Sequence, residues 1–170
     1  MRGLVRATSD LRSLLGLDLE QAQGDVLDRV SLESAMEGCD VVFHAAGIFT
    51  YWVRDARQLE AVVLEGTRNA IEAAASVGVA RVVLTSSSVT CGSSPRPESR
   101  DERDLLRDPD APSYFRMKVR QEREALKLAD ELGIDLVAVC PAITVGGPDY
   151  RLLPSNAIIV NYLNDPFSFT

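Results

Sequence analysis

Tyr114 and Lys118, four positions apart, are the pair of residues in this chain best suited to acid–base chemistry. On a helix, positions i and i+4 lie on one face, so the phenol and the ammonium would be neighbours. A free tyrosine has a pKa of about 10, and a nearby cation favours the phenolate and lowers that pKa. The pair therefore indicates a tunable proton donor and acceptor. The structural alternative is a tyrosine at a helix boundary beside a solvated lysine.

A run of hydroxyl residues, Thr85 to Ser88, directly follows the apolar segment 81–84. In open α/β sheets the ligand crevice lies at the carboxyl ends of the strands, where these hydroxyls would be. They can hold a substrate oxygen while Tyr114 moves its proton. The alternative is a serine-rich turn whose side chains satisfy loose backbone groups.

Two other segments also come directly after apolar runs. Asp25 can accept a hydrogen bond from an adenine amino group, or it can cap a turn into the next helix. Residues 45–47, Ala-Ala-Gly, are small enough for a cofactor to approach the backbone. His44 precedes them on a buried strand, and we interpret it as a hydrogen-bonded core histidine rather than a catalytic one.

Positioning these residues requires strands whose ends meet. Apolar, β-rich runs alternate with helical stretches, which is the pattern of an α/β protein with a parallel sheet. The apolar run 41–46 is typical of a strand covered on both faces. Ser31 is expected to cap a helix that stops at Gly38, and the prolines and charges of 92–112 predict a long surface loop. The expected strands are 3–6, 17–23, 41–46, 81–84 and 136–140, and the other expected helices are 55–77, 112–132 and 156–163.

Composition excludes several classes of protein. The 170 residues suit one domain, and 46% apolar with 25% charged residues is ordinary for a globular protein. The net charge of −7, without a basic patch, argues against nucleic-acid binding, and no apolar run is long enough to cross a membrane. Without a signal peptide, the three cysteines (Cys39, Cys91 and Cys140) are expected to be reduced, mostly buried thiols in a cytoplasmic protein, too few for a disulfide framework or a zinc site.

Taken together, the motifs occur in an order that resembles a known family. The stretches that carry the resemblance are VRATSDLRSLLGLDLEQAQGDVLD, GCDVVFHAAG, EGTRNAIEAA, RVVLTSSSVTCG, YFRMK and CPAITVGGPD. They are similar to the extended short-chain dehydrogenase/reductase superfamily, in its epimerase/dehydratase group. Within that group the chain looks most like dihydroflavonol-4-reductase-like proteins and hopanoid-associated sugar epimerases. The resemblance implies a Rossmann domain that binds NADP or NAD and acts on a small-molecule alcohol or ketone.

The resemblance also implies roles for individual residues. Tyr114 would be the acid/base, Lys118 would lower its pKa and hold the nicotinamide ribose, and Ser87 would position the reacting oxygen. Arg6, at the tip of the first expected strand, slightly favours NADP, because no acid is present there for the 2′-hydroxyl. The remaining positions that match the family's cofactor contacts are Asp25, Val26, Ala45, Ala46, Gly47 and Pro141.

The chain departs from the family's pattern at both ends and at two positions. No Gly-rich phosphate-binding turn can be drawn from its glycines, and Met1 falls where the family's second strand begins. We therefore expect residues 1–170 to be a partial domain: an incomplete Rossmann-type, doubly wound parallel sheet without its first strand or Gly-rich turn, and without the C-terminal substrate lobe. Val63 stands where the family usually has Asn, and Cys140 where it often has Asn or Arg.

These departures leave more than one function open. The first hypothesis is an NAD(P)-dependent reductase or epimerase that uses Tyr-Lys-Ser chemistry. The alternatives are a non-catalytic nucleotide-binding relative and an inactive fragment. Losing about five buried strand side chains would remove on the order of 10 kcal/mol, comparable with the stability of a whole domain. The isolated chain is therefore expected to be marginally stable, rearranged or a homo-oligomer.

Overall fold

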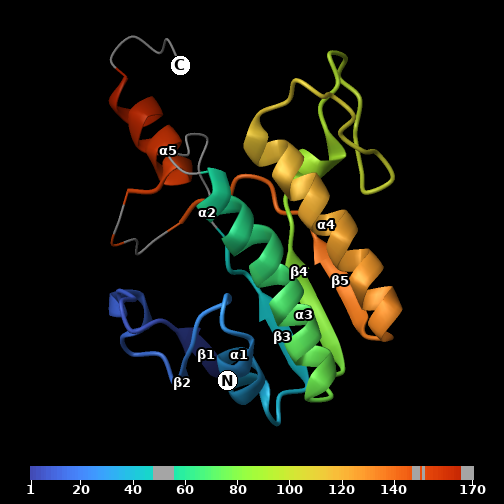
Figure 1. Ribbon diagram of the computed structural model, residues 1–170. Coiled ribbons are helices and arrows are strands. Elements are labelled where there is room, and N and C mark those ends of the chain that lie inside the picture. The colour runs from blue at the N-terminus through green and yellow to red at the C-terminus, as the bar shows by residue number, and fades with distance from the viewer. Residues whose placement is uncertain (48–55, 147–149, 151, 166–170) are drawn as a thin grey trace.

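The computed structural model of the chain describes residues 1–47, 56–146, 150 and 152–165 (Figure 1). In this part of the chain the strands are parallel and form two separate sheets. β1 (Arg2–Val5) pairs with β2 (Glu20–Gln23), and β3 (Val41–His44), β4 (Arg81–Thr85) and β5 (Asp135–Val139) form a three-stranded sheet in the order β3-β4-β5. The predicted α/β class with parallel strands is therefore confirmed.

The helices follow the strands in the expected alternation. The loop 92–112 carries no helix or strand, as predicted. The 3-10 turns η1 (Arg12–Leu14) and η3 (Ser88–Cys91) lie after β1 and β4. The α-helices are α1 (Arg29–Met36), α2 (Ala56–Glu60), α3 (Gly66–Ser76), α4 (Ser113–Leu132) and α5 (Pro154–Asn164).

The helix expected over residues 55–77 is interrupted within its described part, 56–76. A π-helical segment, η2 (Ala61–Glu65), separates α2 from α3, and the amide of Gly66 donates to the carbonyl of Ala61, five residues earlier. Single-turn π segments within helices are frequent at functional sites. Because such a segment has no simple pattern in sequence, the richness of this stretch in Ala, Glu and Arg predicted one uninterrupted helix.

The cap of α1 differs from the expectation. Asp28, not Ser31, is the N-cap: its carboxylate accepts a hydrogen bond from the Ser31 amide at 3.3 Å. The Ser31 hydroxyl instead donates to the carbonyl of Asp28 at 2.7 Å. The other end agrees with the prediction, since Gly38 follows the helix with a φ of 72°, a value that glycine adopts without strain.

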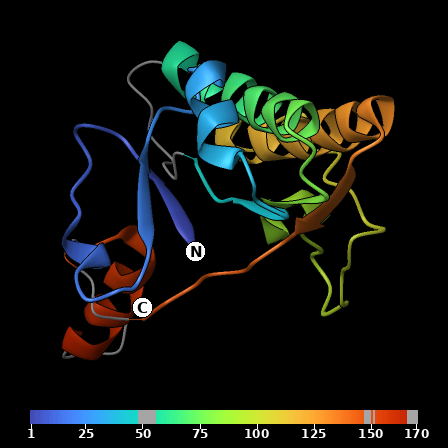
Figure 2. The ribbon, with the colours of Figure 1, turned by 90° about the horizontal axis from the view of Figure 1, so that it is seen from below.

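The apolar core lies between the three-stranded sheet and helices α1, α3 and α4, which all lie on one face of it (Figure 2). One cluster joins α1, α3 and β4, and a second joins α3, β4 and α4. The buried residues of the first are Leu32, Met36, Ala70, Ala73, Ala74, Val79 and Val82, and those of the second are Ile71, Leu84, Ala125 and Ala129. The alanines allow the helices to approach closely.

The opposite face of this sheet does not match the expectation of two covered faces. Phe43 of β3 is 75% exposed and Val41 42% exposed, and Val137 and Val139 of β5 are exposed to a similar degree. Among the described residues no helix lies on this face (Figure 2). The prediction that the strand 41–46 is buried on both sides was therefore wrong: the apolar run indicated two apolar faces, of which only one is packed.

No helix in the described ranges is both long and apolar enough to cross a membrane. All three cysteines are free thiols, but only Cys91 is fully buried, while Cys39 and Cys140 are partly exposed. The described part of the chain holds no cluster of histidine, cysteine and acidic residues placed to bind a metal ion.

Candidate active site

Tyr114 and Lys118 lie in the first turns of α4 and are both buried, each with 8% of its surface exposed. The ammonium of Lys118 donates to the carbonyl of Thr85, at the end of β4, at 3.0 Å. It also donates to the side-chain oxygen of Gln121 at 2.6 Å. Two of the three N–H groups of Lys118 are thus used within the described residues, which leaves one for a partner in the site.

The environment of Lys118 lowers its pKa to about 8. Burial is the main cause, because removing water disfavours the charged form. The negative charge of Glu122, and that of Cys140 where its thiol is ionised at high pH, act in the opposite direction and raise the pKa. At neutral pH the side chain still carries its proton in most molecules.

One cleft of about 520 Å³ gathers most of the residues singled out in the sequence. The strand ends contribute the small residues after β3 and the hydroxyls after β4, and α4 contributes the tyrosine and the lysine. Val63 and the start of α5, Leu153 to Ser155, also line it. The sequence-predicted residues in its lining are Ala45, Ala46, Gly47, Ser87, Tyr114, Lys118 and Pro141.

The serines after β4 have different partners. Ser86 is buried, and its hydroxyl donates to the carboxylate of Glu122 on α4. Ser87 caps the 3-10 helix η3, and its hydroxyl accepts a long bond of 3.4 Å from the amide of Val89. Ser87 therefore has the turn-capping role that was the alternative for these hydroxyls, whereas Ser86 bonds to a side chain. Among the described residues, the hydroxyl proton of Ser87 remains available to a ligand.

Cys140 lies beside Glu122, the residue that accepts from Ser86. Its sulfur is 3.6 Å from Glu122 Oε2 and 3.8 Å from the hydroxyl of Thr90. Burial is the main cause that raises the pKa of the Cys140 thiol. The thiol is thus a neutral hydrogen-bonding group at neutral pH rather than a nucleophile. The contacts of Glu122 with Ser86 and Cys140 were not predicted, although Glu122 follows Lys118 by four positions and so shares its helix face.

His44 behaves as the core histidine that the sequence predicted. It is 5% exposed, and its Nε2 lies 3.0 Å from the hydroxyl of Thr67 on α3. Burial, with a smaller contribution from the charge of Lys118, lowers the pKa of His44 to about 4. The imidazole is therefore neutral at physiological pH and lies buried at the end of β3, directly before Ala45 of the cleft.

Arg6 and Asp25 lie apart from this cleft, around a second hollow of about 440 Å³. The Asp25 carboxylate accepts a hydrogen bond from the Leu27 amide at 3.0 Å, which is the turn-capping role weighed for it in the sequence. Contact with an adenine stays a prediction. Both residues lie at the carboxyl ends of β1 and β2, the edge of the sheet where ligands bind in α/β folds.

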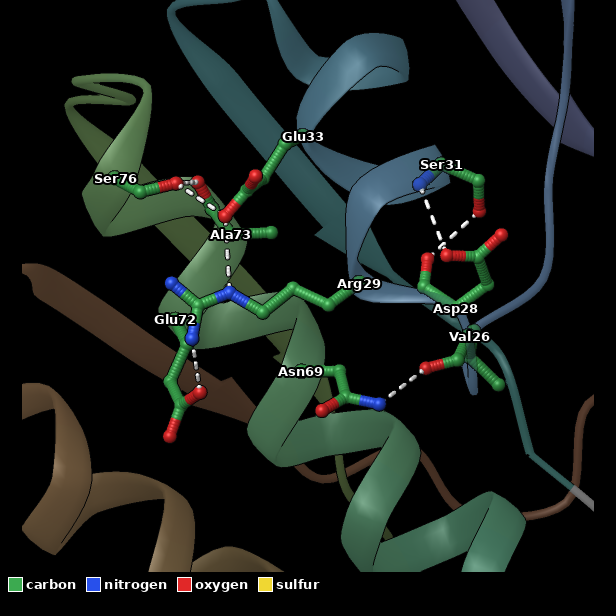
Figure 3. Close-up of polar contacts among 9 residues, drawn as sticks. All are labelled: Val26, Asp28, Arg29, Ser31, Glu33, Asn69, Glu72, Ala73 and Ser76. Carbon is green, nitrogen blue, oxygen red and sulfur yellow. Dashed lines mark hydrogen bonds and ion pairs between the residues drawn. The ribbon is translucent and has the colours of Figure 1, made fainter.

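Val26 is held from below by α3 (Figure 3). The amide nitrogen of Asn69 donates to the carbonyl of Val26 at 3.0 Å. A Cβ added to Gly66 would come within 2.8 Å of the Val26 side chain, so only glycine allows this approach. The loop that carries Asp25 and Val26 is thus fixed by the helix that follows the π segment.

A salt bridge and a hydrogen bond between α1 and α3 complete this support (Figure 3). Arg29 of α1 contacts Glu33 of its own helix at 2.9 Å and Glu72 of α3 at 2.6 Å. The hydroxyl of Ser76 also donates to Glu33 at 2.9 Å. These contacts tie the β1–β2 pair to the rest of the molecule through helices rather than through a shared sheet.

Comparison with known proteins gives consistent matches along the chain. A family model described as NAD(P)H-binding matches residues 1–156. Sterol demethylase protein B of Methylococcus capsulatus is 34% identical over 151 residues, and cinnamoyl-CoA reductase 1 of Petunia hybrida is 36% identical over 160 residues. These alignments cover 89% and 86% of this chain.

The crystal structure of gox2253 is similar in fold as well as sequence. It superposes with a TM-score of 0.85 and 31% identity, over 94% of this chain and 49% of that one. The two relatives above are covered over 46% and 47% of their lengths. The chain therefore spans about half the length of the proteins that it matches.

Proposed function

This chain belongs to the NAD(P)-binding extended short-chain dehydrogenase/reductase family, and on that premise we propose that it interconverts an alcohol and a ketone on a small-molecule substrate with a nicotinamide cofactor. The observation that carries the proposal is that Ser87, Tyr114 and Lys118 line one cleft. Reductases and epimerases both need this acid–base set, and the proposal covers a sugar-nucleotide-like or dihydroflavonol-like substrate.

The residues present fit the two ends of a dinucleotide. The small side chains of 45–47 and the ring of Pro141 leave room beside Tyr114 and Lys118 for a flat nicotinamide with its ribose. Arg6 and Asp25 offer a cation and a hydrogen-bond acceptor for the adenosine end. When bound, the cofactor supplies the hydride acceptor or donor.

The protein's own part in the reaction is to move a proton and hold an oxygen. Tyr114 would pass its phenolic proton to the substrate oxygen in reduction, or take it back in oxidation. The charge on Lys118 favours the phenolate, and its remaining N–H can bind a ribose hydroxyl. Ser87 would donate its hydroxyl proton to the same substrate oxygen and fix its position.

We also propose that the chain prefers NADP to NAD. Arg6 is exposed and lies on two adjoining hollows, one of them shared with Asp25 and Asp28. Its guanidinium suits a 2′-phosphate, because arginine binds phosphate oxygens in a bidentate manner. We expect NADPH to bind more tightly than NADH, and an Arg6→Ala variant to weaken NADPH binding by about 10- to 100-fold while changing NADH binding little.

The two separate sheets support a further element of the proposal. β1 and β3 each have one edge without a strand partner among the described residues. One parallel strand inserted between these edges would join both sheets in the order β2-β1-x-β3-β4-β5, where x is the inserted strand. A Gly-rich turn after that strand would lie between the Arg6 hollow and the Tyr114 cleft, where a dinucleotide has its phosphates.

We also propose that the chain associates with a second copy of itself. The uncovered face of the three-stranded sheet presents Phe43, Val83 and Val137 in one row, because these residues are register partners across β3, β4 and β5. A second copy of the chain would remove this apolar surface from water, which is favourable in proportion to the area buried.

Two measurements test the proposed reaction. The first titrates the purified chain with NADPH and follows cofactor fluorescence; absence of binding at millimolar NADPH would rule the proposal out for this chain. The second follows NADPH consumption with a panel of aldehydes and ketones in the parent, Tyr114→Phe and Tyr162→Phe. Tyr162 is an exposed tyrosine on α5, so its variant is the matched control. We expect Tyr114→Phe alone to lose at least about 100-fold in rate.

Equal rates in all three proteins would overturn the catalytic assignment. Cofactor binding with no turnover in any of them would favour the alternative of a non-catalytic nucleotide-binding relative.

A further inference from the structure

A continuous chain of buried polar side chains runs away from the cleft behind Lys118. Gln121, only 2% exposed, accepts from Lys118 at 2.6 Å through Oε1 and donates through Nε2 to the Thr67 hydroxyl at 2.7 Å. Thr67 also lies 3.0 Å from His44 Nε2. The chain thus joins α4, α3 and β3 through groups that are 8% exposed or less.

Each bond in this chain has a defined direction. The Thr67 hydroxyl has one proton, which it donates to the carbonyl of Val63 in the π segment at 2.6 Å. It must therefore accept from both Gln121 Nε2 and His44 Nε2. This fixes the amide of Gln121 with its nitrogen toward Thr67 and its oxygen toward Lys118. A reversed amide would place its NH2 group against the ammonium, donor against donor.

We propose that Gln121 is a positioning residue for Lys118: its side-chain oxygen holds the ammonium at the cleft, and Thr67, anchored on the Val63 carbonyl, holds the amide. The proposal rests on the function proposed above, in which Lys118 acts in the cleft. A neutral amide suits this position because it fixes the ammonium without neutralising its charge. The charge stays available to the tyrosine and the cofactor ribose.

The competing explanation is that Gln121 only fills space and satisfies Thr67. Both explanations predict a loss of stability when the amide is removed, because a buried donor or acceptor without a partner is unfavourable. They differ on Lys118. Only the positioning role predicts that the protonation of the lysine changes, since the amide oxygen stabilises the charged form directly.

The chain contains only two lysines, which makes the test specific. Lys127, on the same helix, has a side chain that is 78% exposed, so it serves as an internal reference. Protein labelled with ¹³C and ¹⁵N in lysine gives two side-chain signals, which a Lys127→Arg variant assigns. Titration of these signals from pH 6 to about 11 then reports on Lys118 directly.

Two substitutions of Gln121, to Met and to Asn, separate the explanations, and a third, to Glu, shows that Lys118 responds to a group at this position. Gln121→Met keeps the volume without the acceptor, and we expect the Lys118 midpoint to fall by about one pH unit or more. Gln121→Glu places a carboxylate beside the ammonium and is expected to raise the titration midpoint of Lys118. Gln121→Asn is too short to reach both Lys118 and Thr67 and should resemble Met. The other charged or titratable groups near Lys118, namely Tyr114, Glu122, His44 and Cys140, remain unchanged in all three.

The readout does not depend on catalysis. A Lys118 midpoint that stays within about 0.2 units of the parent's in a folded Gln121→Met or Gln121→Asn protein would overturn the proposal, because a solely space-filling glutamine predicts that result. If Gln121→Met does not fold, the shift in Gln121→Asn still decides between the two explanations, because the upward shift in Gln121→Glu is expected under both. Failure of NADPH binding would overturn the proposed function but would leave these titrations interpretable.

Discussion

The side-chain amide of Asn69 reaches the backbone carbonyl of Val26, 43 positions earlier in the chain. This bond holds the loop after β2 on the surface of α3, where Gly66 leaves space for the Val26 side chain. The loop carries Asp25, so one helix supports the residue expected at the adenosine end of the cofactor. The same helix carries Thr67, which lies behind Lys118 at the other end.

Replacing Asn69 with alanine should loosen this loop. The Val26 carbonyl would lose its donor, and we expect the free energy of unfolding to fall by about 1–2 kcal/mol, with weaker NADPH binding. Urea denaturation and cofactor titration measure the two effects. An Arg68→Ala variant, at the exposed neighbouring position, is the control and should lose less than about 0.5 kcal/mol. A fully stable Asn69→Ala protein would show that the bond contributes nothing.

The close approach of Gly66 to Val26 predicts sensitivity to a single methyl group. In Gly66→Ala the new Cβ would lie 2.8 Å from Val26 Cγ2, so α3 must move away from the loop. Overpacking of this kind is destabilising by about 1–3 kcal/mol, measured as a lower midpoint in thermal or urea unfolding. Gly47→Ala, where a Cβ meets nothing within 4 Å, is the matched control for stability. Equal midpoints in the two variants would contradict the packing described here.

The strand pattern and the motif order could be read from the sequence because they depend on local chemistry. Apolar runs located all five described strands to within three residues at each end. The strand-end residues of the cleft followed from the rule that parallel strands present their carboxyl ends together. Tyr114 and Lys118 followed from their spacing on one helix face, and Pro141 from the family resemblance alone. Gln121 was not found, since its importance depends on Thr67, 54 positions away. The π segment was missed because it has no simple pattern in sequence, and the uncovered sheet face because it depends on which distant elements pack against the sheet.

Because His44 is buried in its neutral form, the free energy of unfolding depends on pH. Its pKa is about 4 in the folded protein and about 6.5 in the unfolded chain, so the unfolded chain binds the proton first as pH falls. The stabilising effect is therefore complete above pH 6.5 and is lost as pH falls toward 4. The loss is on the order of 3 kcal/mol. Urea unfolding of the parent and of His44→Gln across this range isolates it, because carboxylates contribute equally to both proteins.

His44 is the only histidine in the chain, so its ring proton resonance can be assigned without ambiguity. A ring that titrates at its ordinary pKa, with parallel stability curves for parent and variant, would refute the prediction.

The row formed by Phe43, Val83 and Val137 on the uncovered face of the three-stranded sheet predicts concentration-dependent association. Phe43→Ser removes the most exposed member, and we expect the association to weaken by about tenfold or more in sedimentation velocity. Leu126→Ser, at an exposed apolar position on α4, is the control and should associate like the parent. A parent chain that stays monomeric at all concentrations would exclude this contact.

The division of the strands into two sheets has a consequence for how the molecule opens. β1 shares its backbone ladder only with β2 among the described strands, and the pair is attached to the core through the α1–α3 contacts. Side-chain contacts of this kind can part without disturbing β4, which is paired on both sides. Amide hydrogens of β1 and β2 should therefore exchange with solvent through a subglobal opening. Those of β4 should exchange only when the whole molecule unfolds. The hollow lined by Arg6 and Asp25 would then belong to the less stable of two cooperative units, and a ligand that bridges this hollow and the Tyr114 cleft would couple them.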